Sequence, residues 1–282
     1  MLTLDKITNW EQMIGEVTNA DCLDAMKLIP DKSIDMILCD LPYGTTACKW
    51  DTIIPFEPLW EQYKRIIKDN GAIVLTASQP FTSALVMSNV KMFRYCWVWE
   101  KDKGANFLQA NFQPLKTHED IICFAYGKTK YNPQKTINPR KQSETNSKQL
   151  SEKRKEAGLN VEFFKSSSVY EKDKLLPRSV QYFSRDIPKG GTLHPTQKPV
   201  ALFEYLIKTY TNEGDLVLDN CAGSGTLGIA AINTKRNYIL IEKDEYYCEV
   251  ASNRIKDTCC KCRRDRILKY KPIDFQPKQE YT

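Results

Sequence analysis

Residues 34–44 read IDMILCDLPYG, and the rest of the chain is organised around this stretch. Its apolar, β-branched first part is typical of a buried parallel strand. Asp40 then lies at the carboxyl end of that strand, where open α/β sheets place their chemistry, and the following proline and glycine force a tight loop. The loop offers the Asp40 carboxylate, the Leu41 carbonyl and an exposed aromatic face of Tyr43, which suit a planar ring bearing an amine. A strand-to-helix turn capped by Asp40 is the alternative.

The composition excludes several classes of protein. The chain has 282 residues, enough for one large α/β domain with an insertion or for two modest domains, and 41% of them are hydrophobic. Mean hydropathy is −0.49, and no apolar run reaches the length of a bilayer span. The amino terminus lacks the apolar core of a signal peptide, and the ten cysteines show no disulfide spacing, so we expect reduced thiols in a cytoplasm.

One segment carries the positive charge of the chain. Residues 128–193 contain fifteen Lys and Arg against seven Asp and Glu, an excess larger than the net charge of +6 for the whole chain. A basic block beside a near-neutral body predicts a polyanionic partner, and its interspersed aromatic and amide side chains suit phosphate contacts and base reading. We predict an inserted lobe here, with a solvated linker as the alternative.

Outside this block, strands and helices alternate. Strands are expected at 16–21, 34–40, 72–76, 94–100, 119–125, 216–219 and 238–241, and helices at 22–28, 56 to about 70, 79–90, 200–210, after 221–228 and at 246–256. This alternation predicts an α/β fold built from parallel βαβ units. The tail from Thr258 is expected to be irregular. Cys259, Cys260 and Cys262 cluster there without a second pair of metal ligands, so we predict no metal site.

The second half carries the pattern of an adenosine site. A strand leads into a small-residue loop at 221–228, and the next strand ends in Glu242 about twenty residues later. Gly223 and Gly225 let the backbone approach a ligand, and Glu242 can accept hydrogen bonds from ribose hydroxyls. The third glycine of the pyrophosphate fingerprint is out of place, and no lysine is set to cradle a phosphate. S-adenosylmethionine therefore fits this loop better than NAD or ATP.

Four motifs in order resemble those of a known family. They are DLPY at 40–43, HPTQKP at 194–199, DNCAGSGTLG at 219–228 and IEKDEYY at 241–247. In this order they resemble the S-adenosylmethionine-dependent N4/N6 DNA methyltransferases of the permuted β class. The resemblance implies a Rossmann-like methyltransferase fold, with a mostly parallel sheet, helices on both faces, a circularly permuted motif order and a basic target-recognition lobe. It implies a catalytic half at 1–127, the lobe at 128–193, a cofactor half at 194–257 and a tail at 258–282.

The resemblance also implies roles for particular residues. Asp40, Leu41, Pro42 and Tyr43 correspond to the catalytic motif, in which Leu41 replaces a proline but supplies the same carbonyl. Cofactor contacts are implied for Asp21, Cys22, His194, Thr196, Lys198, Asp219, Cys221, Gly223, Ser224, Gly225, Thr226, Glu242 and Lys243. The alternatives are a helix cap at Asp21 and a rigid helix-initiating turn at HPTQKP. Cys221 stands where the family has a phenylalanine that packs against the cofactor.

The implied activity is methylation of a base in duplex DNA, without a metal. An adenine would flip into the pocket and stack on Tyr43, while the Asp40 carboxylate and the Leu41 carbonyl accept its N6 hydrogens. Aspartate instead of serine at position 40 resembles adenine-N6 enzymes. The alternatives are cytosine-N4 methylation, RNA methylation and a silent nucleic-acid binder. Double-stranded DNA is the predicted partner, with no membrane and with a homodimer among the open oligomeric states. No nuclease motif is evident, so we predict that this chain only modifies DNA, as in a restriction-modification system, and the existence of a companion endonuclease stays open.

Overall fold

The computed structural model describes residues 2–45, 51–137, 174–186 and 197–262, with side chains described to residue 258. The chain forms two compact units, Met1–Asn132 with Ser179–Thr282, and Pro133–Arg178. In the second unit, β7 (Thr136–Ile137) and β8 (Lys174–Leu175) pair as an antiparallel ladder. This unit, Pro133–Arg178, spans fewer residues than the lobe expected at 128–193. Its role in DNA recognition stays a prediction.

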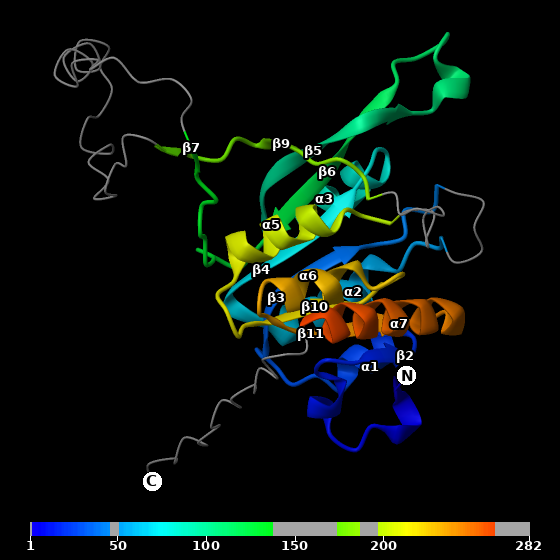
Figure 1. The fold of residues 1–282 in the computed structure, drawn as a ribbon, viewed down its shortest axis with the longest axis vertical. Helices are drawn as coiled ribbons and strands as arrows, with labels where there is room; N and C mark the ends of the chain where they lie inside the picture. Colours follow the sequence, from blue (N-terminus) through cyan, green and yellow to red (C-terminus); the bar gives the residue numbers. More distant parts are fainter. Residues whose placement is uncertain (1, 46–50, 138–173, 187–196, 263–282) are drawn as a thin grey trace, which may run out of the picture. The chain divides into compact units, whose positions relative to one another are not determined.

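The described part of the first unit holds a nine-stranded sheet in the order β1-β2-β11-β10-β3-β4-β6-β5-β9 (Figure 1). The strands are β1 (Leu2–Thr3), β2 (Val17–Asn19), β3 (Ile34–Asp40), β4 (Ile67–Ala77), β5 (Phe93–Ala105), β6 (Lys116–Phe124), β9 (Val180–Tyr182), β10 (Leu216–Asp219) and β11 (Asn237–Glu242). Every neighbouring pair is parallel except the two pairs that involve β6. The mostly parallel sheet is therefore confirmed, and the late strands β10 and β11 lie between the early strands β2 and β3.

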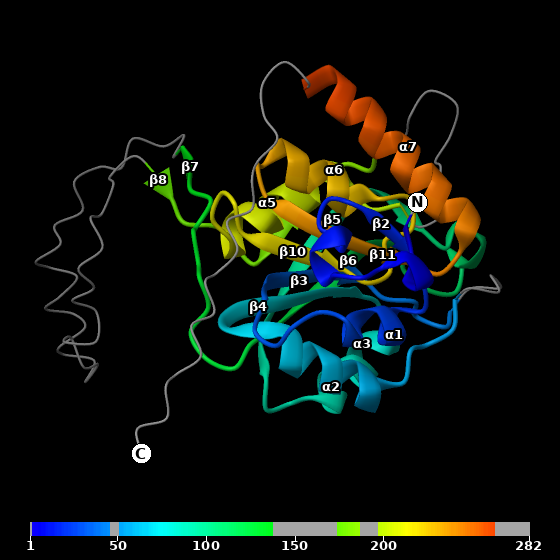
Figure 2. The ribbon, with the colours of Figure 1, turned by 90° about the horizontal axis from the view of Figure 1, so that it is seen from below.

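Helices cover both faces of this sheet, as Figure 2 shows. They are α1 (Cys22–Lys27), α2 (Phe56–Ile66), α3 (Phe81–Ser88), α5 (Val200–Tyr210), α6 (Thr226–Asn233) and α7 (Glu245–Cys262), with 3-10 turns η1 (Leu4–Lys6), η2 (Trp10–Met13) and η3 (Phe107–Gln109). One buried cluster joins α1, α2 and α3 to alternate strand residues such as Ile37, and the other joins α5, α6 and α7 to their neighbours such as Leu38. Strand residues that point to opposite faces thus build two cores. Among the described residues, none of the helices has the length and apolar character needed to cross a membrane.

Several predicted boundaries are wrong. The strand expected at 16–21 ends at Asn19, because Asp21 caps α1 instead, and the strand expected at 94–100 continues to Ala105. The helix expected to reach Asn70-Gly71 ends at Ile66, and β4 begins at once because Ile67 pairs with Ile34 and the Lys68 ammonium lies 2.7 Å from the Asp35 carboxylate. Pairing with β3 thus overrides the turn signal of the local sequence. The tail expected to be irregular from residue 258 is helical through Cys262, since no glycine or proline interrupts it. Residues 263–282 lie outside the described part.

The direction of the strands gathers charged residues at one edge of the sheet. Asp40, Asp219 and Glu242 are the last residues of the parallel strands β3, β10 and β11. Because β6 runs the other way, its beginning lies at this edge, with Ile121 opposite Thr76 near the end of β4. Glu119, two residues earlier in β6, therefore comes to the same edge.

Candidate active site

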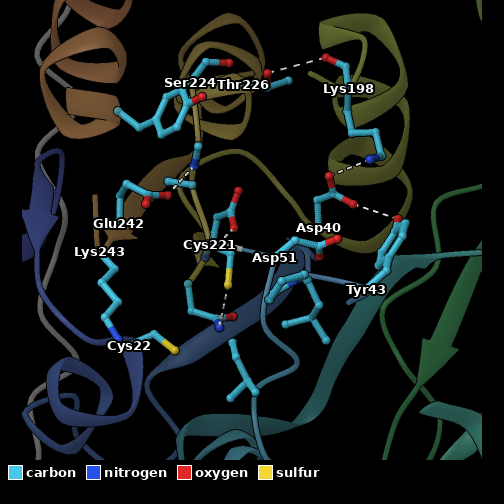
Figure 3. Close-up of a pocket in the computed structure, with 18 of the residues that line it drawn as sticks. Cys22, Asp40, Tyr43, Asp51, Lys198, Cys221, Ser224, Thr226, Glu242 and Lys243 are labelled. Atoms are coloured by element: carbon cyan, nitrogen blue, oxygen red, sulfur yellow. Dashed lines mark hydrogen bonds and ion pairs between the residues drawn. The ribbon is translucent and has the colours of Figure 1, made fainter. Parts of the chain in front are cut away.

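A cavity of about 840 Å³ opens at this edge of the first unit, and residues from both halves of the sequence line it (Figure 3). The predicted site residues that line it are Asp21, Cys22, Asp40, Leu41, Pro42, Tyr43, Lys198, Asp219, Cys221, Gly223, Ser224, Thr226, Glu242 and Lys243. Gly225 does not line it but caps the amino terminus of α6. His194 and Thr196 lie outside the described residues. The fold thus brings the described predicted residues together, whereas their contacts with a cofactor stay predictions.

The loop after β3 is held by Asp51, for which the sequence predicted no role. The amides of Gly44 and Thr45 donate to the two carboxylate oxygens of Asp51 at 2.8 and 2.9 Å. Gly44 has a φ of +66°, and a Cβ there would lie 3.0 Å from a side-chain carbon of Ile53. A glycine is therefore required for this turn, and Asp51 closes it.

The Asp40 carboxylate is fixed by three neighbouring donors. The Tyr43 hydroxyl lies 2.8 Å from Oδ1, and the hydroxyl of Thr76 also donates to Oδ1. The ammonium of Lys198 donates to Oδ2. An ionised carboxylate has about four acceptor positions, two on each oxygen. The contacts among the described residues therefore leave an acceptor position on Oδ2 for a ligand.

Lys198 joins Asp40 to a second carboxylate. Its side chain is only 5% exposed, and its ammonium lies 3.5 Å from Oε2 of Glu119, whose Oε1 accepts from Lys101. Burial alone would raise the pKa of Glu119, but Lys198 and Lys101 hold that pKa below its usual value. Burial alone would lower the pKa of Lys198, but Asp40 and Glu119 raise it. Lys198, for which a cofactor contact was implied, thus contacts the catalytic loop, and Lys198 and Glu119 both stay charged.

Tyr43 is less open than the sequence suggested. Its half-buried ring stacks on Phe81, with centroids 5.2 Å apart and planes 25° apart, and the Lys198 ammonium lies 5.6 Å from the ring centroid. The expected exposed aromatic face is therefore partly covered. Burial, followed by the charge of Asp40, raises the pKa of Tyr43 well above its usual value, so its hydroxyl stays a donor.

At the other end of the cavity, Glu242 is oriented by the backbone. Oε2 accepts from the amide of Gly223 at 2.8 Å, and Oε1 accepts from the amide of Asp244 at 2.9 Å. Burial raises the pKa of Glu242. Each of its oxygens has a second acceptor position for a ligand hydroxyl. Asp21 caps α1, because the Leu23 amide donates to its Oδ1 at 3.0 Å, and it also faces the cavity.

The glycine-bearing loop is packed tightly between its neighbours. Gly225 has a φ of +76°, and a Cβ there would lie 2.9 Å from Cβ of Ala251 on α7. Asp219 is 3% exposed and accepts from the Cys221 amide at 3.0 Å, and burial raises its pKa to about 7. Asn220 accepts from the Tyr63 hydroxyl at 2.5 Å, which anchors the loop to α2.

The charge of the cavity suits a cationic nucleoside. Seven carboxylate residues line it against four cationic residues: Asp21, Asp40, Asp51, Glu119, Asp219, Glu242 and Asp244 against Lys101, Arg185, Lys198 and Lys243. A ribose needs acceptors such as Glu242, and a positive sulfonium is favoured where negative charge is in excess. The residues present therefore fit S-adenosylmethionine.

Comparison with known proteins agrees with this geometry. Residues 34–253 match the model of a family described as DNA methylase. The chain is 28% identical over 249 residues to the Type II methyltransferase M.HpaI of Haemophilus parainfluenzae, and the matched region covers 84% of this chain and 72% of that protein. It is 28% identical over 264 residues to the Type II methyltransferase M2.MboI of Moraxella bovis, with 84% and 86% covered.

Solved structures share the fold. A complex of M1.HpyAVI with SAM superposes with a TM-score of 0.57 at 22% identity, covering 85% of this chain and 98% of that one. The cytosine-N4-specific PvuII DNA methyltransferase superposes with a TM-score of 0.58 at 14% identity, covering 86% and 90%. The predicted methyltransferase fold is thereby confirmed.

Proposed function

Because this chain belongs to the DNA methylase family, we propose that it transfers a methyl group from S-adenosylmethionine to N6 of an adenine in duplex DNA. The observation that carries this proposal is the Asp40 carboxylate, which three donors hold at the cavity with an acceptor position of Oδ2 available. The fold alone does not choose the base, since the PvuII enzyme of the same fold is cytosine-N4-specific. Aspartate at position 40 favours adenine.

Residues at one end of the cavity would bind the cofactor, and residues at the other end would bind the base. Glu242 would accept from the ribose hydroxyls, and the backbone at Gly223 allows the nucleoside to approach. When bound, S-adenosylmethionine supplies an electrophilic methyl group on its sulfonium. A stacked adenine must first leave the duplex to reach the cavity. Oδ2 of Asp40 and the Leu41 carbonyl would then accept its two amino hydrogens.

These hydrogen bonds explain how the chain assists the transfer. They draw the nitrogen lone pair out of conjugation with the ring and aim it into the cavity. The methylated nitrogen would then lose one of its protons to solvent, and S-adenosylhomocysteine would leave as the neutral thioether. Tyr43, Thr76 and Lys198 keep the carboxylate from turning, so its orientation is set before the base arrives. The rate gain comes from alignment and from charge placed in advance.

The test is nucleoside mass spectrometry on unmethylated duplex DNA after incubation with the protein and S-adenosylmethionine. We expect N6-methyladenine, and we expect Asp40→Ala to lower the rate about 10³-fold or more. Affinity for S-adenosylmethionine, measured by calorimetry, should change less than about threefold, because Asp40 serves the base and not the nucleoside. The matched control is Asp69→Ala, which removes an exposed partner of Lys32 and should leave the rate unchanged.

Two results would contradict the proposal. Production of N4-methylcytosine would refute the choice of base while leaving the fold and the cofactor in place. Methylation by Asp40→Ala at the wild-type rate would show that Asp40 does not accept the amino group.

A further inference from the structure

The hairpin that joins β5 to β6 carries apolar side chains in full contact with solvent. All ten residues from Asn106 to Leu115 are exposed. Among them, Phe107 is 74% exposed, Leu108 84% and Phe112 90%. In Figure 1 this hairpin projects beyond the rest of the sheet. A group of large apolar side chains left in water on a projecting tip indicates a contact surface.

The same hairpin forms part of the wall of the cavity. Trp99, Lys101 and Ala105 of β5 and Glu119 of β6 line it. Ala105 is the residue directly before the exposed tip. The tip therefore begins where the wall of the cavity ends.

The chemistry of the tip matches a nucleic acid. Residues 106–115 contain no charged side chain, and four amides, Asn106, Gln109, Asn111 and Gln113, alternate with the apolar residues. Lys103 and Lys116 flank them. Amides pair with base edges, large apolar side chains enter between stacked bases, and lysines meet phosphates. This combination favours a duplex over a second copy of the chain.

The stem of the hairpin is paired on both sides of β5, with a register shift between Glu100 and Ala105. Glu100 pairs with His118 and Ala105 with Lys116 across the hairpin, and β9 pairs with the outer side of β5. Arg185, which follows β9, lies 3.0 Å from the Asp102 carboxylate. A Cβ on Gly104 would lie 2.8 Å from Cβ of Leu115, so the two strands approach closely just below the tip. A tip carried by paired strands is placed more precisely than a tip on a free loop.

We propose that residues 106–115 enter the DNA beside the target adenine, and that Phe107, Leu108 and Phe112 fill the space that the flipped base leaves. This inference rests on the proposed function, because a wedge is needed only where a base leaves the stack. The wedge takes over stacking contacts that the neighbouring bases lose, so it lowers the cost of flipping.

The test compares two duplexes that carry the recognition sequence, mapped first from DNA methylated by the wild-type protein. In one the target adenine faces thymine, and in the other it faces an abasic site, so that it is already unpaired. The triple variant F107S/L108S/F112S should lower kcat/KM about thirtyfold on the paired duplex and less than about threefold on the other. The matched control Met87→Ser removes a side chain that is 72% exposed on α3, and it should behave as wild type on both.

Folding of the triple variant is checked by its affinity for S-adenosylmethionine and its melting temperature, and Phe112→Ser alone should show a smaller loss of the same kind. Equal losses on the two duplexes, or no loss on either, would overturn the wedge. The wedge would also be overturned if light scattering found the wild-type protein as a dimer and the triple variant as a monomer with unchanged activity per chain, because the tip would then be an interface between two copies. Failure of the proposed function is seen separately, as the absence of methylated adenine with the wild-type protein, and it would overturn both proposals.

Discussion

Replacing Lys198 with methionine removes the cation that Asp40 and Glu119 share but keeps an unbranched side chain of similar length. Breaking a buried ion pair by removing one partner typically costs about 3–5 kcal/mol. Here Glu119 retains Lys101, and the Asp40 side chain is 19% exposed toward the cavity, so water offsets part of the loss. We therefore expect Lys198→Met to lower the free energy of unfolding by about 2–3 kcal/mol.

The same variant should slow methyl transfer. Oδ2 of Asp40 loses its donor, and only the contacts of Tyr43 and Thr76 with Oδ1 remain to orient the carboxylate. A catalytic group misplaced by about 1 Å costs on the order of 10²-fold in rate. Single-turnover methyl transfer should therefore fall about 10²-fold for Lys198→Met, and Lys198→Arg, which keeps the charge, should recover part of the rate.

The stability loss should depend on pH. The pKa of Glu119 is lowered in the folded protein, so its contribution is present above the pKa of the unfolded chain and is lost as pH falls through the folded value. The pKa of Lys198 is raised, so its contribution is present below the unfolded value and is lost as pH rises through the folded value. The difference between wild type and Lys198→Met should therefore be largest near neutral pH and shrink toward acid and alkali.

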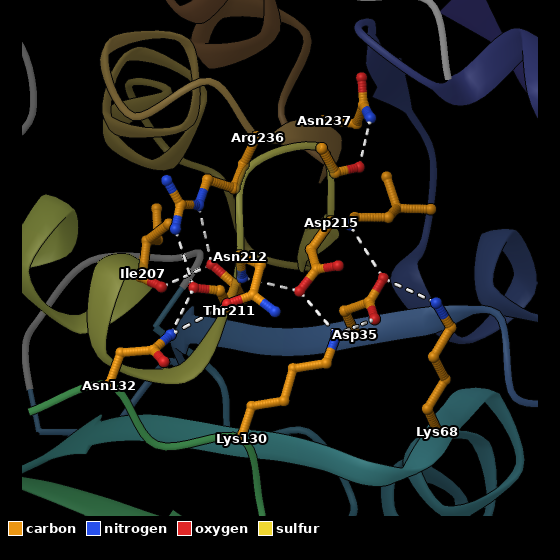
Figure 4. A network of polar contacts seen from close by, with 12 residues as sticks. Asp35, Lys68, Lys130, Asn132, Ile207, Thr211, Asn212, Asp215, Arg236 and Asn237 are labelled. Atoms are coloured by element: carbon orange, nitrogen blue, oxygen red, sulfur yellow. Dashed lines mark hydrogen bonds and ion pairs between the residues drawn. The ribbon is translucent and has the colours of Figure 1, made fainter. Parts of the chain in front are cut away.

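A second network supplies the matched control. Lys130 lies 2.9 Å from the Asp35 carboxylate and 2.7 Å from that of Asp215, near the amino ends of β3 and β10 (Figure 4). Lys130→Met also removes a lysine shared by two carboxylates, but it does so away from the cavity. Urea unfolding should show a loss for both variants, and the rate should fall for Lys198→Met alone. Equal rates for the two variants would refute the positioning role of Lys198.

Two further changes test single groups. Tyr43→Phe keeps the ring but removes the hydroxyl that donates to Asp40, so kcat should fall about tenfold with little change in affinity for S-adenosylmethionine; an unchanged kcat would contradict this. Burial raises the pKa of Asp219 to about 7 in the folded protein. The free energy of unfolding therefore falls as pH rises from about 4 to 7, and above that range the loss due to Asp219 is at most about 4 kcal/mol. Asp219→Asn should therefore gain stability relative to wild type over this range in urea unfolding at several pH values, whereas a constant difference would rule out titration of Asp219.

The local sequence was sufficient to predict a feature that lies within one element of the fold. The strand Ile34–Asp40 and the loop before α6 form as predicted, because apolar runs and glycines act within a few residues. The partners of these elements could not be predicted in the same way. Lys198 lies 158 residues from Asp40 in the chain, and Asp51 reaches the Gly44 amide across the turn, so only the folded chain shows these contacts. Thr76 and Lys101 were missed for the same reason.

Glu119 is a residue that the strand-end rule could not predict. The expectation that chemistry lies at the carboxyl ends of strands holds for parallel strands, and it identified Asp40 and Glu242, whereas Asp219 came from the family resemblance. Glu119 lies near the beginning of β6, so the rule gave it no role. Because β6 alone is antiparallel in the described sheet, its beginning reaches the edge where the parallel strands end. This reversal also makes β5 and β6 a hairpin, so one topological feature both places Glu119 beside Lys198 and carries Phe112 beyond the wall of the cavity.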